Sequence, residues 1–403
     1  MNSIPAPFEL GRLPRITFGP GRLADVPTIV SRHGSRALLI TGGASFRGSP
    51  AYGRLRDGLV KAGVDIGGEL SVSGEPSPDV LNEALERHRG SGIDVVLAVG
   101  GGSVLDMGKA VAGLLESGTA LLDHLEGVGA GLPYPGPALP TIAVPTTAGT
   151  GSEATRNAVF STSGPDGYKR SFRDERLVPA EAVVDPDLLA GAPRSLIAAN
   201  GLDALTQLIE SFTSRRAGPL TDSLARSGLA AARDGLRAWY REPDGEGAAE
   251  ARSRMAYAAL MSGICLANAG LGAVHGLASP LGALLPIPHG MACGAVLWQT
   301  TDANITALED RDPGSIGLTR YAEIARLIDP QEVPVADDGA ARGALVETLR
   351  SWTSQLDVPS LATFGMRPED IATVVADSAG SSMRTNPIVL TDTELTSILS
   401  KAL

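Results

Sequence analysis

The chain has 403 residues, a formal net charge of −11 at pH 7 and two cysteines. A single hydrophobic core stops growing at about 250–300 residues, so the length predicts two domains. The acidic charge argues against a nucleic-acid surface, which needs basic residues for the phosphates, and two cysteines make no disulfide framework. The N-terminal segment has neither a basic start nor an apolar run, and no apolar stretch could span a bilayer. We therefore expect a cytoplasmic protein that binds neither nucleic acid nor a membrane.

Strand-like and helix-like segments alternate in the first half of the chain. Short apolar runs that end at turn-forming residues predict strands at residues 36–41, 94–99, 141–145 and 180–185. Helices are expected at residues 50–63 and 78–89, between the first two strands. This alternation is typical of a parallel sheet with helices on both faces.

Helix-forming sequence dominates from about residue 195 onward. Apolar residues recur at three- and four-residue spacing in residues 200–212, 223–240, 250–271 and 344–356, which predicts amphipathic helices. Proline and glycine in residues 185–195 mark a boundary. We expect an α/β dinucleotide-binding domain at residues 1–190, an all-α metal and substrate domain at residues 191–403, and a ligand in the cleft between them.

A glycine-rich turn follows the second predicted strand, in VGGGSVLDMGKAVA (residues 99–112). The backbone N–H groups of Gly100, Gly101 and Gly102 can approach a phosphate because no Cβ stands in the way. The start of the following helix adds partial positive charge, and Ser103 adds a hydroxyl donor. A tight turn without a ligand would have the same sequence, so this segment alone leaves both interpretations open.

A second turn, PTTAGTGSEAT (residues 145–155), follows the third predicted strand. Its hydroxyl and N–H groups suit a pyrophosphate or a nicotinamide carboxamide, although an ordinary Gly/Thr loop would look similar. Two such turns in one parallel-sheet domain favour a dinucleotide more strongly than either turn alone.

A possible metal site comes from the second half. Two of the five histidines, His275 and His289, lie 14 residues apart in one compact segment. Upstream, Asp203 and Gln207 are four residues apart, which places them on one helix face. A carboxylate, two imidazoles and an amide can hold a divalent cation that polarises a carbonyl oxygen. Histidines with purely structural roles remain the alternative.

Several motifs together resemble the group III, or iron-containing, alcohol dehydrogenases. GGGSVLDMGKA, PTTAGTGSEAT, GLDALTQLIE and HGLASPLGALLPIPHG occur in the order and approximate spacing of that family. GRLPRITFGPGRL and DPDLL also look like it, so the resemblance covers about residues 10–400. It implies a Rossmann-like N-terminal domain, a helical C-terminal domain and the dehydroquinate synthase-like fold.

The resemblance also implies roles for individual residues. The pyrophosphate would be held by Gly100, Gly101, Gly102, Ser103 and Asp106. Thr146, Thr147 and Thr150 would line the cofactor phosphates and nicotinamide, and Lys169 stands at the place of a cofactor-binding lysine. Asp203, His275 and His289 match three of the four metal ligands and would form the catalytic centre with a divalent iron or zinc ion.

Two positions depart from the family pattern. The fourth metal ligand is usually a histidine, and here it is Gln207, whose amide oxygen is a weaker ligand. Ser279 stands where many members have a histidine near the nicotinamide. Proton delivery is therefore unassigned among water, Ser279 and a cofactor ribose hydroxyl, and a metal-independent reductase resembling maleylacetate reductase stays an alternative.

The segment after the first predicted strand also differs from the NAD-type pattern. No carboxylate follows Thr41, where it would bond a ribose 2′-hydroxyl, and Gly42, Gly43, Ser45 and Arg47 stand there instead. Serine and arginine could bind a 2′-phosphate, so we expect NADP(H) to be favoured over NAD(H).

The reaction expected from these features is hydride transfer between a nicotinamide and an aldehyde or ketone, or the corresponding alcohol, in a homodimer or higher homo-oligomer. A dehydroquinate synthase-like lyase would need more polar residues than residues 272–294 provide. A non-catalytic dinucleotide-binding protein remains an alternative because of Gln207.

Overall fold

The computed structural model describes residues 7–162, 167–331 and 337–403, which form two compact units. The α/β unit contains Gly11–Thr147 and Gly151–Leu189, and the helical unit contains residues 7–10, Ala148–Thr150 and Ala190–Leu403. No single described helix is both long and apolar enough to cross a membrane. One bent pair of helices, Ala248–Ala269 and Ala273–Leu284, meets that test only when the two are taken together, at an angle of 101°.

The α/β unit is built on a six-stranded parallel sheet in the order β1-β8-β5-β4-β2-β3. Its strands are β1 (Arg15–Phe18), β2 (Arg36–Gly42), β3 (Asp65–Val72), β4 (Val95–Gly100), β5 (Thr141–Pro145) and β8 (Glu181–Val184). A separate antiparallel pair consists of β6 (Asn157–Thr162) and β7 (Tyr168–Arg173). The predicted fold class is confirmed, although the edge strands β1 and β3 and the β6–β7 pair were not predicted.

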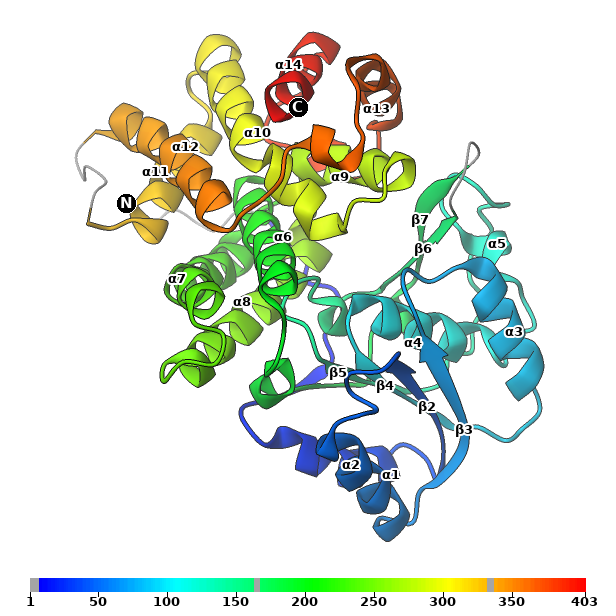
Figure 1. Cartoon of the computed structure of the whole chain (residues 1–403). Coiled ribbons are helices and arrows are strands. Elements are labelled where there is room, and N and C mark those ends of the chain that lie inside the picture. The colour runs from blue at the N-terminus through cyan, green and yellow to red at the C-terminus, as the bar shows by residue number, and fades with distance from the viewer. Residues whose placement is uncertain (1–6, 163–166, 332–336) are drawn as a thin grey trace. The chain divides into compact units, whose positions relative to one another are not determined.

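Helices cover both faces of this sheet (Figure 1). They are α1 (Val26–Ser31), α2 (Pro50–Lys61), α3 (Pro78–His88), α4 (Gly102–Leu114) and α5 (Leu121–His124), with short 3₁₀ turns η1 (Arg22–Asp25), η2 (Ser152–Ala154), η3 (Glu175–Leu177) and η4 (Pro186–Leu189). Side chains alternate along a strand, so in β2 Leu38 and Ile40 pack with α3 and α4, while Ala37 and Leu39 pack with α1 and α2. Burial on both faces explains why the inner strands are continuous apolar runs.

The carboxyl ends of the parallel strands lie at one edge of the sheet. The chain leaves β2 toward β3 on one side and returns to β4 on the other, so the strand order reverses between β2 and β4. Ligands of open α/β sheets bind at the carboxyl ends beside such a reversal. The two segments that start there, Gly42–Arg47 and Gly100–Ser103, are those in which the sequence predicts cofactor-binding residues.

The helical unit consists of nine described α-helices. They are α6 (Arg194–Thr213), α7 (Pro219–Arg241), α8 (Ala248–Ala269), α9 (Ala273–Leu284), α10 (His289–Arg311), α11 (Ile316–Ile328), α12 (Asp338–Gln355), α13 (Ile371–Asp377) and α14 (Asp392–Ala402), with 3₁₀ turns η5 (Leu361–Phe364), η6 (Pro368–Asp370) and η7 (Met383–Thr385). The four predicted helical segments fall within α6, α7, α8 and α12, apart from one or two residues at their ends.

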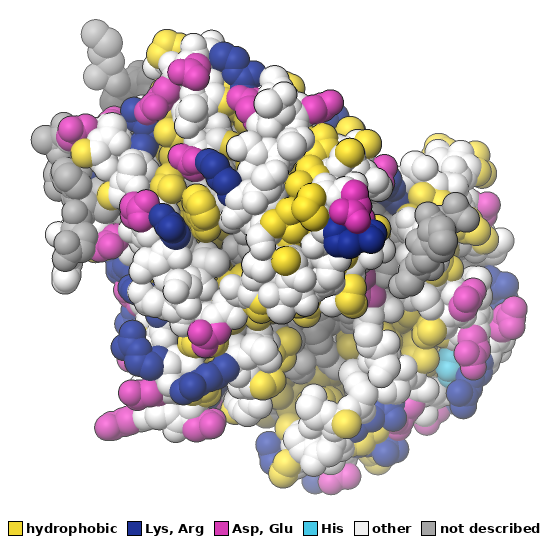
Figure 2. Space-filling view, turned by 45° about the horizontal axis from the view of Figure 1, so that its top comes forward, with side chains coloured by type: hydrophobic (Ala, Val, Ile, Leu, Met, Phe, Trp, Pro, Cys, Tyr) yellow, Lys and Arg dark blue, Asp and Glu magenta, His cyan; other side chains and the backbone are white. Residues whose placement is uncertain are grey.

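Helix α6 is the central element of this unit, because it packs against α7, α8 and α10 and is buried along most of its length. Glycines allow the close approach. A Cβ on Gly201 would lie 2.1 Å from Leu236 of α7, and a Cβ on Gly228 of α7 would lie 2.6 Å from Leu208 of α6. Polar side chains on α6 are therefore held in a rigid, desolvated setting. On the face shown in Figure 2, Lys and Arg side chains are interspersed with Asp and Glu.

Candidate active site

Four side chains with metal-binding atoms converge in the helical unit. They are Asp203 of α6, His275 of α9, and His289 and Cys293 of α10. One such atom from each lies within 4.8 Å of those of the other three, and no other group of this kind occurs in the described parts of the chain. Asp203, His275 and Cys293 are buried, whereas the side chain of His289 is 26% exposed. His289 is thus the member of the cluster that is open to small molecules.

The atoms of the cluster are close enough to share one ion. Asp203 Oδ1 lies 3.2 Å from His275 Nε2 and 3.9 Å from His289 Nε2. Cys293 Sγ lies 3.8 Å from His275 Nε2 and 3.9 Å from His289 Nε2. The structure therefore brings together Asp203, His275 and His289, which the sequence grouped from 72 and 14 residues apart, and adds Cys293.

A glycine brings α10 to α6 at this point. Pro288 is the N-cap of α10 and His289 is its first residue, so the Pro-His-Gly segment starts a helix instead of making the sharp bend that we expected. A Cβ on Gly290 would lie 1.8 Å from the carbonyl oxygen of Ala199, one turn before Asp203. The absence of that Cβ lets the first turn of α10 contact α6, which places His289 beside Asp203.

The Glu210 carboxylate orients His275. Glu210 lies seven residues after Asp203 on α6, and its Oε2 is 2.5 Å from His275 Nδ1. Its Oε1 accepts hydrogen bonds from the backbone N–H groups of Val274 (2.7 Å) and His275 (3.4 Å) in the first turn of α9. An ionised carboxylate only accepts hydrogen bonds, so Nδ1 carries a hydrogen and Nε2 is left to face Asp203. Gly272 permits this contact, because a Cβ there would lie 2.9 Å from Glu210.

The Gln207 side chain also reaches the cluster, through its amide nitrogen. Nε2 donates to Asp203 Oδ1 at 3.1 Å and to the Thr150 carbonyl at 3.4 Å. Oε1 accepts from the hydroxyl of Ser262 at 2.9 Å. Gln207 thus presents N–H groups to Asp203, and it ties the Ala148–Thr150 segment to α6.

Burial and mutual contacts shift the pKa values of the cluster. Burial disfavours the charged form of Asp203, but the hydrogen bond from His275 and the nearby imidazoles outweigh it and lower the pKa of Asp203. Burial opposes protonation of His275, yet Cys293, Glu210 and Asp203 together raise the pKa of His275 well above its usual value. Burial raises the pKa of the Cys293 thiol. In the absence of a cation, the cluster is neutralised by a proton on His275.

Models of known families match both halves of the chain. The description "Iron-containing alcohol dehydrogenase" covers residues 14–186, and "Fe-containing alcohol dehydrogenase family, C-terminal" covers residues 197–403. The chain belongs to the iron-containing alcohol dehydrogenase family. This membership confirms the resemblance noted from the motifs and makes the protein an oxidoreductase that transfers a hydride between a nicotinamide nucleotide and a carbonyl compound or its alcohol.

Relatives of the family are similar over nearly the whole chain. The chain is 29% identical to an NAD-dependent methanol dehydrogenase of Bacillus methanolicus, over 97% of its own length and 98% of that protein. It is 31% identical to lactaldehyde reductase of Escherichia coli K12, over 88% of each. The crystal structure of a 1,3-propanediol oxidoreductase superposes with a TM-score of 0.87 at 26% identity, covering 99% of this chain and 100% of that one.

The predicted phosphate-binding turn has the geometry that this family membership suggests. Gly101 is the N-cap of the 13-residue helix α4, which begins directly after β4 with Gly102 and Ser103 in its first turn. A Cβ on Gly100 would lie 2.5 Å from Val104, so this glycine also serves the packing of strand against helix. The N–H groups at the start of a helix suit an anion such as a pyrophosphate, so a dinucleotide fits this turn.

The second turn runs beside the first. Thr146 N donates to Gly100 O at 2.9 Å, and a Cβ on Gly101 would lie 3.2 Å from Thr147. Thr150 belongs to the helical unit with Ala148–Thr150. The roles of these threonines toward the cofactor stay predictions.

Asp106, which we expected at the pyrophosphate, is engaged within the α/β unit. Its carboxylate accepts hydrogen bonds from Ser152 Oγ (2.5 Å) and Val159 N (3.0 Å). It also pairs with Lys109 Nζ at 2.9 Å. Lys109 is fully buried, and its ammonium group donates to Ser152 Oγ (2.7 Å) and Thr155 Oγ1 (3.2 Å) as well. This network fastens the Ser152–Thr155 segment to α4.

The segment after β2 contains the predicted adenosine-binding residues. Arg47 Nε donates to Thr41 Oγ1 at 2.6 Å, and Nη2 donates to the Leu70 carbonyl at 3.4 Å. The guanidinium also lies 3.5 Å from Glu69 Oε2 on β3. Gly42 ends β2, and Gly43 and Ser45 follow it. Arg47 therefore lies beside the end of β2 with several protein acceptors of its own.

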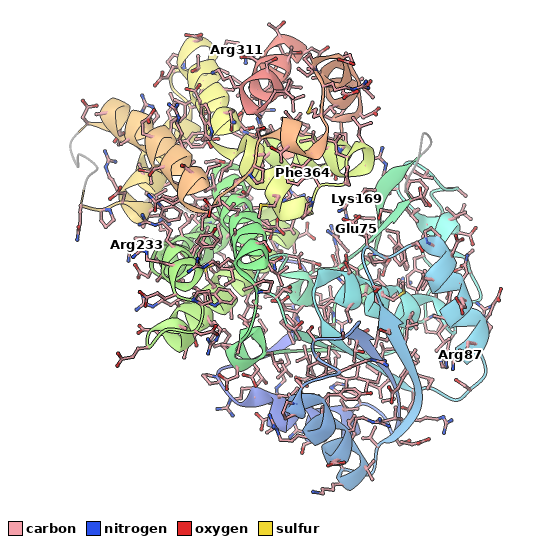
Figure 3. The ribbon with its side chains drawn as sticks, viewed as in Figure 1. Glu75, Arg87, Lys169, Arg233, Arg311 and Phe364 are labelled. Atoms are coloured by element: carbon pink, nitrogen blue, oxygen red, sulfur yellow. The ribbon has the colours of Figure 1, made fainter. Side chains whose placement is uncertain are left out.

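Lys169, the predicted cofactor-binding lysine, lies on β7. Figure 3 shows it next to Glu75, with which it forms an ion pair. The Lys169 side chain is 13% exposed, and Glu75 also accepts a hydrogen bond from Ser161 Oγ at 2.7 Å. A cofactor role for Lys169 stays a prediction, and its carboxylate partner lies beside it.

Three polar residues of these sites were missed from the sequence. Cys293 follows His289 by four residues, the same helical spacing that linked Asp203 to Gln207. Glu210 follows Asp203 by seven residues, which is two helical turns. Both signals were present in the sequence. Lys109 gave no comparable signal, since its partners at 152–155 come from a distant segment.

Proposed function

We propose that this protein is a nicotinamide-dependent alcohol dehydrogenase or aldehyde reductase whose substrate oxygen meets a divalent cation held by Asp203, His275 and His289. The observation that carries the proposal is the convergence of these three side chains, with His275 aimed by Glu210. Two imidazole nitrogens and a carboxylate oxygen are ligands that both iron and zinc accept. The donor set therefore fits such an ion.

The cation, when bound, supplies Lewis-acid polarisation of the substrate oxygen, while the nicotinamide supplies or accepts the hydride. The chain's own residues prepare the site. Glu210 holds the hydrogen of His275 on Nδ1 and keeps Nε2 directed at Asp203. The buried positions of Asp203 and His275 exclude water from two sides. His289, the more exposed member, borders the space that a substrate would occupy.

Proton transfer involves other groups. The hydroxyl of Ser279 donates to the backbone carbonyl of His275 at 3.2 Å, one turn earlier on α9. Ser279 is therefore available only if this bond within the helix exchanges. A water molecule or a ribose hydroxyl of the cofactor is the better proton route in our proposal.

We propose NADP(H) as the favoured cofactor, because no carboxylate directly follows β2 and Ser45 and Arg47 stand there. The contacts of Arg47 with Thr41, Leu70 and Glu69 limit its capacity for a 2′-phosphate, so the preference should be modest, about tenfold or less. The measurement is kcat/KM with NADPH and with NADH. Arg47→Ala should lower only the NADPH value, and an unchanged ratio would refute the role of Arg47.

Metal analysis of the purified protein tests the main proposal. The protein is assayed with NADPH and a panel of short aldehydes before and after a chelator, and then after addition of Fe²⁺ or Zn²⁺. We expect about one ion per chain, loss of turnover on stripping and recovery on reloading. Full activity of the stripped protein would support the metal-independent alternative instead. Binding of NADPH without turnover would support a dinucleotide-binding protein.

We further propose that the protein is cytoplasmic and forms a homodimer or higher homo-oligomer that acts on small carbonyl compounds or alcohols. Light scattering of the purified protein coupled to size-exclusion chromatography tests the assembly. A monomeric mass at micromolar concentration would contradict it.

A further inference from the structure

The place of the fourth metal ligand in this chain is taken by a residue that cannot offer an electron pair toward the cluster. Gln207 directs Nε2 at two acceptors, Asp203 Oδ1 and the Thr150 carbonyl, while Oε1 accepts from Ser262. Rotating the amide by 180° would set its oxygen against those two acceptors and its NH₂ group against Ser262. The hydrogen bonds therefore fix an orientation in which Gln207 donates, and a cation would find no amide oxygen there.

Cys293 fills the fourth corner of the cluster instead. Its sulfur lies 3.8 Å and 3.9 Å from the Nε2 atoms of His275 and His289, and it shares the 4.8 Å group with Asp203. A tetrahedral ion with ligand distances of about 2.0–2.3 Å has ligand-to-ligand edges of about 3.3–3.8 Å. The Asp203–His275 and Asp203–His289 separations of 3.2 and 3.9 Å are of the same size. Small side-chain shifts would thus complete a four-ligand site.

The backbone holds Cys293 in this place. It lies one helical turn after His289, so both side chains project from one face of α10. The next residue, Gly294, has no Cβ to collide with Leu202 of α6, which would lie 2.7 Å away. The second turn of α10 is therefore pressed against α6 beside Asp203, and Cys293 is fully buried there.

We propose that Cys293 is the fourth metal ligand of this protein, in a set with Asp203, His275 and His289, and that Gln207 positions Asp203. The inference rests on the proposed metal site and deepens it. On binding, the thiol gives up its proton to the solvent and the sulfur bonds to the ion. A thiolate is a soft ligand, so this set should favour Zn²⁺ or Co²⁺ more than a set with nitrogen in its place.

Cobalt substitution tests the proposal by a signal that needs no turnover. The purified protein is stripped with a chelator and titrated with Co²⁺, and the near-ultraviolet absorption is recorded for thiolate-to-cobalt charge transfer. The wild-type protein should show this band together with the visible bands of tetrahedral Co²⁺. Visible cobalt bands without charge transfer would overturn Cys293 as a ligand and leave the metal site itself standing. No cobalt binding by a turning-over enzyme would overturn the proposed metal function as well.

Variants locate the sulfur that binds. Cys293→Ser should lose the band and weaken Zn²⁺ binding by at least about ten- to hundredfold in competition with a chromophoric chelator. Cys265→Ser is the matched control, because Cys265 is also buried but its sulfur faces the Thr221 carbonyl at 3.5 Å. It should keep both band and affinity.

A second pair of variants protects the test against misfolding. If Cys293→Ser does not fold by circular dichroism, the wild-type spectrum still decides the presence of sulfur. Cys293→Ala combined with Gln207→His moves the fourth ligand to the other side of the cluster. This double variant should regain Zn²⁺ affinity relative to Cys293→Ala without regaining the charge-transfer band. Equal Zn²⁺ affinity of Cys293→Ala and the wild type would refute the proposal.

Discussion

Replacing Glu210 by glutamine should weaken the metal site without changing its size. The carboxylate accepts from His275 Nδ1 and from the Val274 N–H, at 2.5 and 2.7 Å. A glutamine in this place has one oxygen for two donors. If its oxygen keeps Val274, its NH₂ group faces Nδ1 and drives the imidazole hydrogen onto Nε2, where it blocks the lone pair that faces Asp203. If its oxygen keeps His275, the NH₂ group meets the backbone N–H.

The magnitude follows from the bond that is lost. A hydrogen bond to a charged group contributes about 1.5–3 kcal/mol, and removing such a partner of a metal-binding histidine typically costs about 10–100-fold in metal affinity. A ten- to hundredfold loss equals about 1.4–2.7 kcal/mol, so the two figures agree. We expect Glu210→Gln to raise the Kd for Zn²⁺ by that factor and to lower the free energy of unfolding of the metal-free protein by about 1–3 kcal/mol.

The assay is chelator competition for Zn²⁺ together with urea unfolding of the stripped protein. Glu323→Gln is the matched control, since its carboxylate pairs with Arg226 on the surface and is 34% exposed. An exposed pair contributes about 0–1 kcal/mol, so this variant should bind Zn²⁺ as the wild type does. A Kd for Glu210→Gln within twofold of the wild type would refute the orienting role of the carboxylate.

Three further changes test the packing and the buried charges. Gly290→Ala should cost about 3 kcal/mol or more, because its Cβ would lie 1.8 Å from the Ala199 carbonyl oxygen; Gly282→Ala, with nothing within 4 Å, should be neutral or stabilising by up to about 1 kcal/mol, and equal unfolding midpoints would contradict this. Lys109→Met should cost about 3–5 kcal/mol in urea unfolding, because it leaves a buried carboxylate unpaired, and a loss below about 1 kcal/mol would show the network to be dispensable. Burial raises the pKa of Glu153 to about 7, so the folded protein holds a proton that the unfolded chain releases above about pH 4.3. Stability should therefore fall by up to about 3 kcal/mol as the pH rises from 4.3 to 7, and Glu153→Gln should flatten that slope; an identical pH profile for both proteins would refute it.

The inner strands were predictable because burial on two faces leaves a simple signal. β2, β4, β5 and β8 are apolar runs that end at turn-forming residues, and the sequence located all four within about one residue at each end. β3 was missed because Gly67 and Gly68 weaken its strand pattern. A Cβ on Gly68 would lie 2.3 Å from the His88 ring, and one on Gly67 would lie 2.7 Å from the Arg36 side chain. These glycines follow from packing between distant segments, which local sequence does not reveal.

Sequence by itself determined the class of the two halves, the glycine turns after β2, β4 and β5, and the grouping of Asp203 with His275 and His289. Periodicity and turn chemistry act over a few residues, so they are readable along the chain. Only the tertiary structure decided which polar atoms meet, because hydrogen bonding depends on side-chain direction across helices that are far apart in sequence. It turned the amide nitrogen of Gln207 toward Asp203, set Glu210 behind His275 and brought the sulfur of Cys293 into the cluster.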